Sequence, residues 1–540
     1  MVPGDTPMGV QHNEKVLLSE ELARDPTQEK PAHLTGVRLF LVMIALLIGM
    51  FLVALDMNIV STAIPKITAQ FHSVDTVGWY ASSFFLTLAC FQSPWGKAYK
   101  YFPLKTTFFA SVVLFEAGSL IAGVAQNNTT FIVGRAITGV GGAGITGGVY
   151  IITALIVKPT QVPVYLGLLG AVFSCASVCG PLLGGVFTDK TSWRWCFYIN
   201  LPVGGFVLLI LIFFFHTPGR HKPTPASWTD ILLQMDPLGI LIILCAMVCY
   251  CLALQWGGVH DPWSSSRVIG TLVGWVLLTV AFSIDQWLQG EKALLVARFL
   301  QRREIAVCCA FIFFLNSSNF LLIYNLPVYF QAIANASPMG SGIRNLPLML
   351  ASSICTLLSG SLLKYAKGRF QLFLVAGSAV LTIGAGMLYT MGLNPSTGQY
   401  IGYQILVGVG VGLSIQIPVM ACQTLVDPVD IPVVTSMVLF FQLISGALSV
   451  PAAQSIFDNQ LVAGLAIYAP SVSPASVFAA GATEIRDLFL PSQLPGILLA
   501  YLKGIKASWA LGIALGGTAV LVSWIPMKKL GNTPVIGAVG

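Results

Sequence analysis

Charged residues are scarce in this chain. Asp, Glu, Lys and Arg together make up only 9% of its 540 residues. A soluble globular protein carries about 25% charged residues. Hydrophobic residues make up 56% of the chain, and the mean hydropathy is +0.81. This balance excludes an ordinary soluble domain and predicts a polytopic all-α membrane protein.

Several kinds of chemistry also lack the residues that they need. No phosphate loop of the form G-x-x-x-x-G-K-[ST] occurs, which argues against an ATP-driven pump. The 11 cysteines show no zinc-like paired spacing, and most lie in apolar runs. The histidines are scattered rather than clustered: His12, His33, His72, His216, His221 and His260. We therefore expect no enzyme activity, no metal and no cofactor.

The positive charge of the chain follows a membrane topology. The net charge of +7 comes from Lys and Arg that lie mostly in short loops, and no basic-aromatic patch predicts a nucleic-acid partner. These residues concentrate in the loops that share a side with the N-terminal segment, which predicts both termini in the cytosol. Residues 1–36 contain no apolar core followed by a cleavage site, so we expect a cytosolic tail there.

A membrane-spanning helix needs about 20 mostly apolar residues. Fourteen stretches of the chain meet this condition: 38–62, 77–97, 106–125, 131–155, 162–188, 198–216, 237–256, 268–288, 304–330, 345–366, 371–392, 399–426, 431–455 and 508–527. An even number of spans agrees with two cytosolic termini.

Two cytosolic loops resemble each other. The second and third spans are joined by GKAYKYFPLK (96–105), and the tenth and eleventh by GSLLKYAKGRF (360–370). Basic loops occur in any helical membrane protein, but two parallel repeats around a midplane site are typical of transporters.

This similarity predicts two six-helix halves separated by an insertion. The expected parts are a cytosolic tail (1–36), an N-terminal half (37–216), two inserted helices with linkers (217–303), a C-terminal half (304–527) and a second tail (528–540). Within the C-terminal half, residues 456–507 are expected to form a large amphipathic outer segment on the membrane surface.

Charges inside the spans are the first candidates for function. Asp56 and Glu116 are the only carboxylates well inside, and Arg135 also lies in a span. A charge near the bilayer centre costs on the order of 2.5–3.5 kcal/mol, so it usually faces a cavity or a partner. We expect Asp56 and Arg135 to face each other as a proton switch, and Glu116 to bind and release protons. The alternatives are a static ion pair and a neutral carboxyl that bonds to a neighbouring helix.

Neutral polar and aromatic side chains inside the spans predict a cavity for an amphipathic organic ligand. Interhelical hydrogen bonding is an alternative for each of them taken singly. The candidates are Trp79, Tyr80, Tyr324, Gln416, Gln423, Phe441 and Gln442. Asn335 begins a sequon in an outer loop and is a candidate glycosylation site.

The stretch GPLLGG (180–185) places Gly180, Pro181, Gly184 and Gly185 inside an apolar run. Proline removes one helical hydrogen bond and bends the helix, and glycines let another helix approach closely. A bend with a smooth glycine face suits a place where two halves rock or seal, and helix packing alone is the alternative.

GPLLGG, preceded by Gly167 and Gly170, resembles the antiporter motif of the major facilitator superfamily. ALDMNIVSTAIP around Asp56 resembles the first-span motif of the fourteen-span drug:proton antiporter branch, and GRAITGVGGAG resembles its fourth-span motif with Arg135. WRWCFYINLPVGG and FFQLISGALSV are similar to fungal toxin and multidrug efflux members. The resemblance covers about residues 38–527 and implies the major facilitator fold with fourteen transmembrane helices.

The resemblance also implies a function. It implies proton-coupled efflux of an amphipathic organic compound, such as a fungal secondary metabolite, toxin or drug, by alternating access. A proton-coupled siderophore–iron importer of the same fold is the alternative. The expected partners are the small molecule, protons and membrane lipid, and the expected form is a monomer in the plasma membrane. One departure is that Lys100 stands where the wider superfamily has an Asp, so that Asp's gating role does not carry over.

Overall fold

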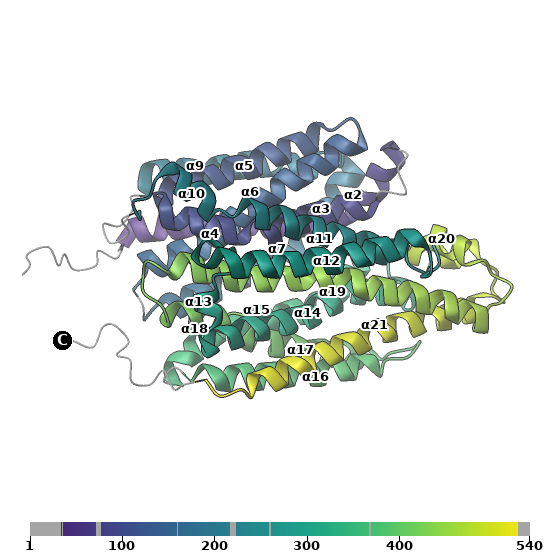
Figure 1. Ribbon diagram of the computed structural model, residues 1–540. Helices are drawn as coiled ribbons and strands as arrows, with labels where there is room; N and C mark the ends of the chain where they lie inside the picture. The colour runs from purple at the N-terminus through teal and green to yellow at the C-terminus, as the bar shows by residue number, and fades with distance from the viewer. Residues whose placement is uncertain are drawn as a thin grey trace, which may run out of the picture.

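The computed structural model describes residues 34, 36–71, 77–158, 160–215, 223–258, 261–366 and 369–527. Within these ranges the chain is helical, with a single isolated β-bridge between Gly257 and Asp261. Figure 1 shows the long helices running side by side along one direction of the bundle.

The helices divide into three consecutive groups. The first comprises α2 (Gly36–Phe71), α3 (Val77–Cys90), α4 (Gln92–Tyr101), α5 (Leu104–Val124), α6 (Asn128–Ile156), α7 (Val162–Lys190), α8 (Trp195–Tyr198) and α9 (Asn200–Phe214). The second comprises α10 (Trp228–Gln234), α11 (Pro237–Trp256), α12 (Ser266–Gln289), the short η2 (Gly290–Lys292) and α13 (Ala297–Leu300). The third comprises α14 (Arg303–Ala332), α15 (Pro338–Tyr365), α16 (Phe370–Tyr389), α17 (Thr397–Ser414), α18 (Ile417–Thr424), α19 (Ile431–Tyr468), α20 (Pro474–Leu488) and α21 (Leu494–Ser523).

The described residues contain 13 helices that are long and apolar enough to cross a membrane. The predicted second span (77–97) instead consists of two shorter helices, α3 and α4, interrupted at Phe91. The expected all-α membrane fold is therefore confirmed.

The predicted outer segment 456–507 is wrong in its boundaries. Helix α19 continues to Tyr468 and α21 already begins at Leu494, so the predicted last span (508–527) also starts too late. The two extensions pack against each other: the rings of Phe457 and Tyr501 lie 5.7 Å apart, and Leu461 is fully buried. This pairing gives the two extensions a helical partner, and the position of the segment on a membrane surface stays a prediction.

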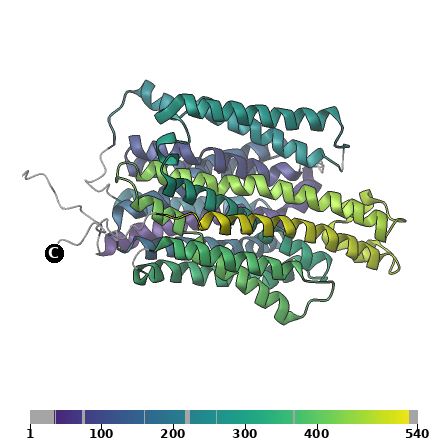
Figure 2. The ribbon, with the colours of Figure 1, turned by 60° about the horizontal axis from the view of Figure 1, so that its bottom comes forward.

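The start of α2 and the end of α21 lie at the same end of the bundle, which we call the terminal end (Figure 1). Helices α11 and α12 lie along one edge of the bundle (Figure 2), and only 11% of the most apolar window of α12 is buried inside the protein. The exposed apolar surface of α12 is what a helix in contact with lipid requires.

The inserted helices are attached to α4 at the terminal end. The side chain of Lys97, only 2% exposed, donates to the carbonyls of Gln234 (2.7 Å) and Lys292 (2.6 Å), which flank the inserted pair. Asp236 is fully buried and accepts from Gln286 Nε2 at 2.7 Å, from the backbone N–H of Gly239 in the first turn of α11 and from that of Leu294 after the pair. The described chain directly before and after the inserted pair is therefore bonded to the bundle.

Candidate functional site

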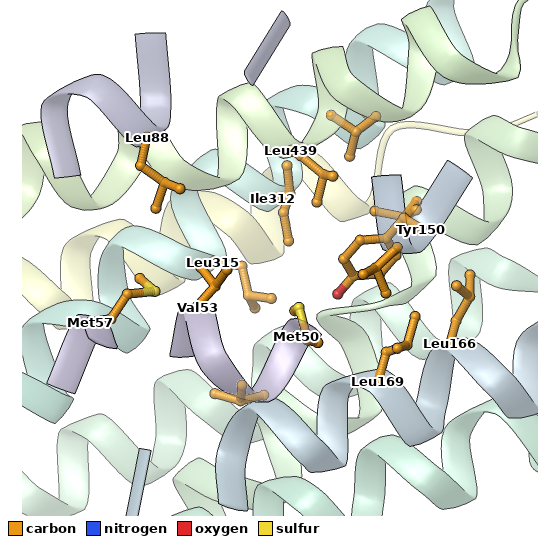
Figure 3. Close-up of a cluster of buried hydrophobic side chains, with 14 of the residues drawn as sticks. Met50, Val53, Met57, Leu88, Tyr150, Leu166, Leu169, Ile312, Leu315 and Leu439 are labelled. Carbon is orange, nitrogen blue, oxygen red and sulfur yellow. The ribbon is translucent and has the colours of Figure 1, made fainter. Parts of the chain in front are cut away.

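A cavity lies between the first and third groups of helices. Met50 and Tyr150 from the first group are near Leu315 and Leu439 from the third group (Figure 3). The polar side chains of its lining are all neutral: Thr146, Tyr150, Ser174, Ser177, Asn316, Asn319, Ser352, Thr356, Gln416 and Gln442. We call this space the central cavity.

Amide side chains connect the walls of the central cavity. Gln416 donates to the Tyr150 hydroxyl at 3.0 Å, which links the C-terminal half to the N-terminal half. Asn316 donates to the backbone carbonyl of Gln442 at 2.7 Å. These partners hold polar groups in an otherwise apolar wall, as a site for an amphipathic ligand needs.

Three of the seven candidate cavity residues line a cavity. Gln416 and Gln442 line the central cavity, and Tyr324 lines a second cavity beside it. The structure places the other four candidates outside both cavities. Their surroundings differ: Trp79 and Phe441 pack in an apolar cluster that includes α11, Tyr80 packs 5.0 Å from the Phe131 ring, and Gln423 donates to the Thr435 hydroxyl at 3.1 Å.

Asp56 on α2 and Arg135 on α6 form a buried ion pair, with exposed fractions of 0% and 1%. Arg135 also donates through Nε to the backbone carbonyl of Tyr80 at 3.2 Å, and its guanidinium lies 4.5 Å from the centre of the Phe84 ring. The predicted contact between Asp56 and Arg135 is therefore present. Its role in coupling remains a prediction.

Two neutral side chains extend this pair. Asn200 on α9 donates to Asp56 Oδ1 at 3.3 Å and to the hydroxyl of Ser119 on α5 at 3.1 Å. All of these groups are buried, so the pair sits inside a polar network that spans four helices.

Glu116 lies one helical turn before Ser119 on α5. It is 9% exposed, and neither carboxyl oxygen has a hydrogen-bond partner among the described residues. Its carboxyl lies directly against Gly204, one turn after Asn200 on α9, where any larger residue would collide with it. Glu116 also lies close enough to Asp56 to interact electrostatically.

Four of these residues were not predicted from the sequence, namely Ser119, Asn200, Asn316 and Asn319. Their signal was present as polar side chains inside apolar runs, for example in FLNSSNF (314–320). A search for charges overlooks neutral amides, because an amide costs much less than a charge in a membrane helix.

The glycine motif of α7 packs within the N-terminal half. A Cβ atom at Gly180 would lie 2.7 Å from Asn58 Cβ, and one at Gly184 would lie 2.6 Å from the Ile59 carbonyl, both on α2. A Cβ atom at Gly185 would meet nothing within 4 Å, and Pro181 lies inside the helix. The contact with the other half is instead made by Gly167 and Gly170, which face Thr356 on α15.

The two halves meet at the terminal end. Lys100 on α4 pairs with Asp430 at the start of α19, with Nζ and Oδ1 3.0 Å apart. Asp430 also pairs with Arg298 at 3.1 Å, and Gly96 allows α4 to approach the Pro432 carbonyl closely. Lys100 thus takes part in an ion pair between the halves. We call this contact region the terminal-end seal.

Asn335 is exposed in the connection between α14 and α15 and has a left-handed backbone conformation (φ 49°). Glycosylation there remains a prediction.

Two helical halves around a cavity lined by neutral polar groups, closed at one end, define a membrane transporter. The family model of the Major Facilitator Superfamily matches residues 46–450, and the chain belongs to this superfamily.

Curated relatives agree with this assignment. The "MFS-type transporter grgE" of Penicillium sp is 45% identical over 94% of this chain and 89% of its own length. The "Efflux pump aflT" of Aspergillus parasiticus is 40% identical over 94% of this chain and 99% of its own length. The relatives thus include fungal efflux transporters.

A solved structure supports the fold alone. The human organic anion transporter MFSD10 (TETRAN) matches with a TM-score of 0.57 at 12% identity, over 91% of this chain and all of the other.

Proposed function

We propose that this protein exports a neutral amphipathic organic compound, of the secondary-metabolite or toxin class, in exchange for protons. The observation that carries the proposal is the buried Asp56–Arg135 pair beside a cavity without charged lining. The buried ion pair is suited to couple transport to protons, and a cavity lined by neutral side chains is suited to an uncharged substrate.

The lining of the central cavity supports this substrate class. Apolar side chains such as Met50 and Phe173 accommodate rings or alkyl groups, while Asn319 and Gln416 can bond to ketone, hydroxyl or amide groups. A charged substrate would lose its hydration without gaining a counter-ion, which disfavours it. The names of the related efflux pumps agree with export.

The polar network supports coupling to protons. A proton that binds Asp56 removes its negative charge and so releases Arg135 from the pair. Glu116, buried and without a hydrogen-bond partner among the described residues, is suited to hold a proton, and Ser119 and Asn200 connect its helix to Asp56. One proton supplies about 2.3 kcal/mol per 100 mV of membrane potential and about 1.4 kcal/mol per pH unit.

The topology belongs to the same proposal. The start of α2 and the end of α21 both lie at the terminal end, and the basic loops predict that this end faces the cytosol. The terminal-end seal then corresponds to an outward-facing transporter in the plasma membrane. A monomer is sufficient, because the ion pair and the central cavity are formed within one chain.

The test is deletion of the gene in its host, with metabolites inside and outside the cells compared by mass spectrometry. We expect one compound to accumulate inside and to fall outside, and re-expression of the wild-type gene should reverse both changes. An unchanged export profile together with lost uptake of iron chelates would overturn export and favour the importer.

A further inference from the structure

A second cavity lies beside the central cavity, and we call it the side chamber. Its walls come from α3, α11, α14 and α19, and the ring of Phe320 lines both spaces. Phe320 therefore forms the partition between the side chamber and the central cavity.

Helix α19 makes room for this chamber. A Cβ atom at Gly446 would lie 2.6 Å from the Phe320 ring, so glycine is required for the partition to lie against α19. Pro451 lies inside α19 and cannot donate to the carbonyl of Ala447 one turn earlier. Ala447 and Pro451 both line the chamber. The small side chain of Ala447 and the proline inside α19 leave space there.

The side chamber differs from the central cavity in the kind of polar side chain that lines it. Its lining lacks any charged or amide side chain, and its polar groups are the hydroxyls of Ser82 and Tyr324 and the thiol of Cys251. Tyr324 is 40% exposed and lines this space. The amides Asn316, Asn319, Gln416 and Gln442 all line the other side of the partition.

The inserted helix α11 also reaches this site. Cys251 of α11 lines the chamber, and the adjacent Tyr250 donates to the Leu448 carbonyl of α19 at 2.8 Å. This hydrogen bond holds α11 against the chamber wall, so the insertion contributes to a possible ligand site as well as to the lipid-facing surface.

We propose that the side chamber binds the apolar tail of a neutral amphipathic substrate whose polar head lies in the central cavity. The proposal rests on the proposed function and adds to it a second subsite, with Phe320 as the residue over which the substrate passes. The residues of α3, α11 and α19 that line the chamber then determine which tail lengths fit.

The test uses n-alkyl 4-hydroxybenzoates from methyl to octyl, which share one neutral polar head and differ only in tail length. A pump-deficient yeast expresses the wild type, Ala447→Phe, or Leu277→Phe as a control of equal bulk on the exposed face of α12. Resistance is the growth-inhibiting concentration with the pump divided by that without it. Val450→Phe, which also fills the chamber, is the second variant if Ala447→Phe does not reach the membrane.

We expect wild-type resistance to rise with tail length, because each methylene that enters an apolar chamber strengthens binding by up to about fourfold. Ala447→Phe should lower resistance to the octyl ester by about tenfold or more and change that to the methyl ester less than about twofold. Leu277→Phe should behave as the wild type.

Three results would overturn the proposal. An equal loss for all esters would make the chamber a part of the conformational path, and an unchanged profile would leave it without a role in substrate binding. A wild type that exports no ester would exclude this ligand class from the chamber. The metabolite comparison tests export separately, so either proposal can fail while the other stands.

Discussion

Asp56 and Arg135 are the residues on which the proposed mechanism depends most. Each is buried in a membrane protein, and each is tolerated because the other neutralises it. Breaking a buried pair from one side costs about 3–5 kcal/mol, since the remaining charge has no partner. Any single substitution at this pair therefore changes both the stability of the protein and its proposed coupling to protons.

A double substitution separates the two effects. Asp56→Asn alone should destabilise the protein by about 3–5 kcal/mol, because Arg135 stays charged and buried. Asp56→Asn with Arg135→Gln removes both charges and should recover most of that loss, as measured by thermal unfolding in detergent. Proton-driven export should be absent in both variants. Wild-type export by the stable double variant would contradict the coupling role.

Asp56 and Arg135 could be found from the sequence because a charge in an apolar run stands out against its neighbours. Asn200 could not be singled out in the same way, because its importance comes from hydrogen bonds to both Asp56 and Ser119. That geometry depends on how α9 packs against α2 and α5.

At the scale of elements, α7 shows how one helix serves two contacts. Gly180 and Gly184 face α2 of the same half, whereas Gly167 and Gly170 face α15 of the other half. The sequence predicted a smooth glycine face in this helix. The sequence did not show that the two pairs of glycines face different helices, because each pair is spaced at a helical interval.

Neighbouring glycines of α7 provide a matched test. Gly184→Leu should destabilise the protein by at least about 1–3 kcal/mol, because its side chain would overlap Ile59 and Thr62 of α2. Gly185→Leu is the control and should stay within about 0.5 kcal/mol, since a Cβ atom there meets nothing within 4 Å. Thermal unfolding in detergent measures both. Equal effects would show that helix propensity, rather than packing on α2, decides the result.

At the scale of the whole molecule, the terminal-end seal joins the halves through groups distant in sequence. Lys100 and Arg298 both contact Asp430, so α4, the linker helix α13 and α19 meet at one carboxylate. The pairs are partly exposed, and such pairs contribute up to about 1 kcal/mol. A contribution of this size shifts a conformational equilibrium without controlling folding.

Lys100→Met should favour opening at the terminal end. A loss of about 1 kcal/mol would raise the open population about fivefold. Spin labels on unnatural amino acids at positions 106 and 369, one on each half, report this as a longer distance. Lys105→Met is the control, because Lys105 bonds to the Ile212 carbonyl within its own half. A similar shift in both variants would refute a specific role for Lys100.

Segments of about 20 apolar residues, the buried charges and the class of transporter could all be read from the linear chain. Burial of a helical backbone in lipid depends on the local run of side chains, and a local run is visible without a structure. The relation of the halves, the partition at Phe320 and the partner of Lys100 required the folded molecule. Each arises from side chains far apart in sequence, whose contacts depend on how the helices pack rather than on their composition.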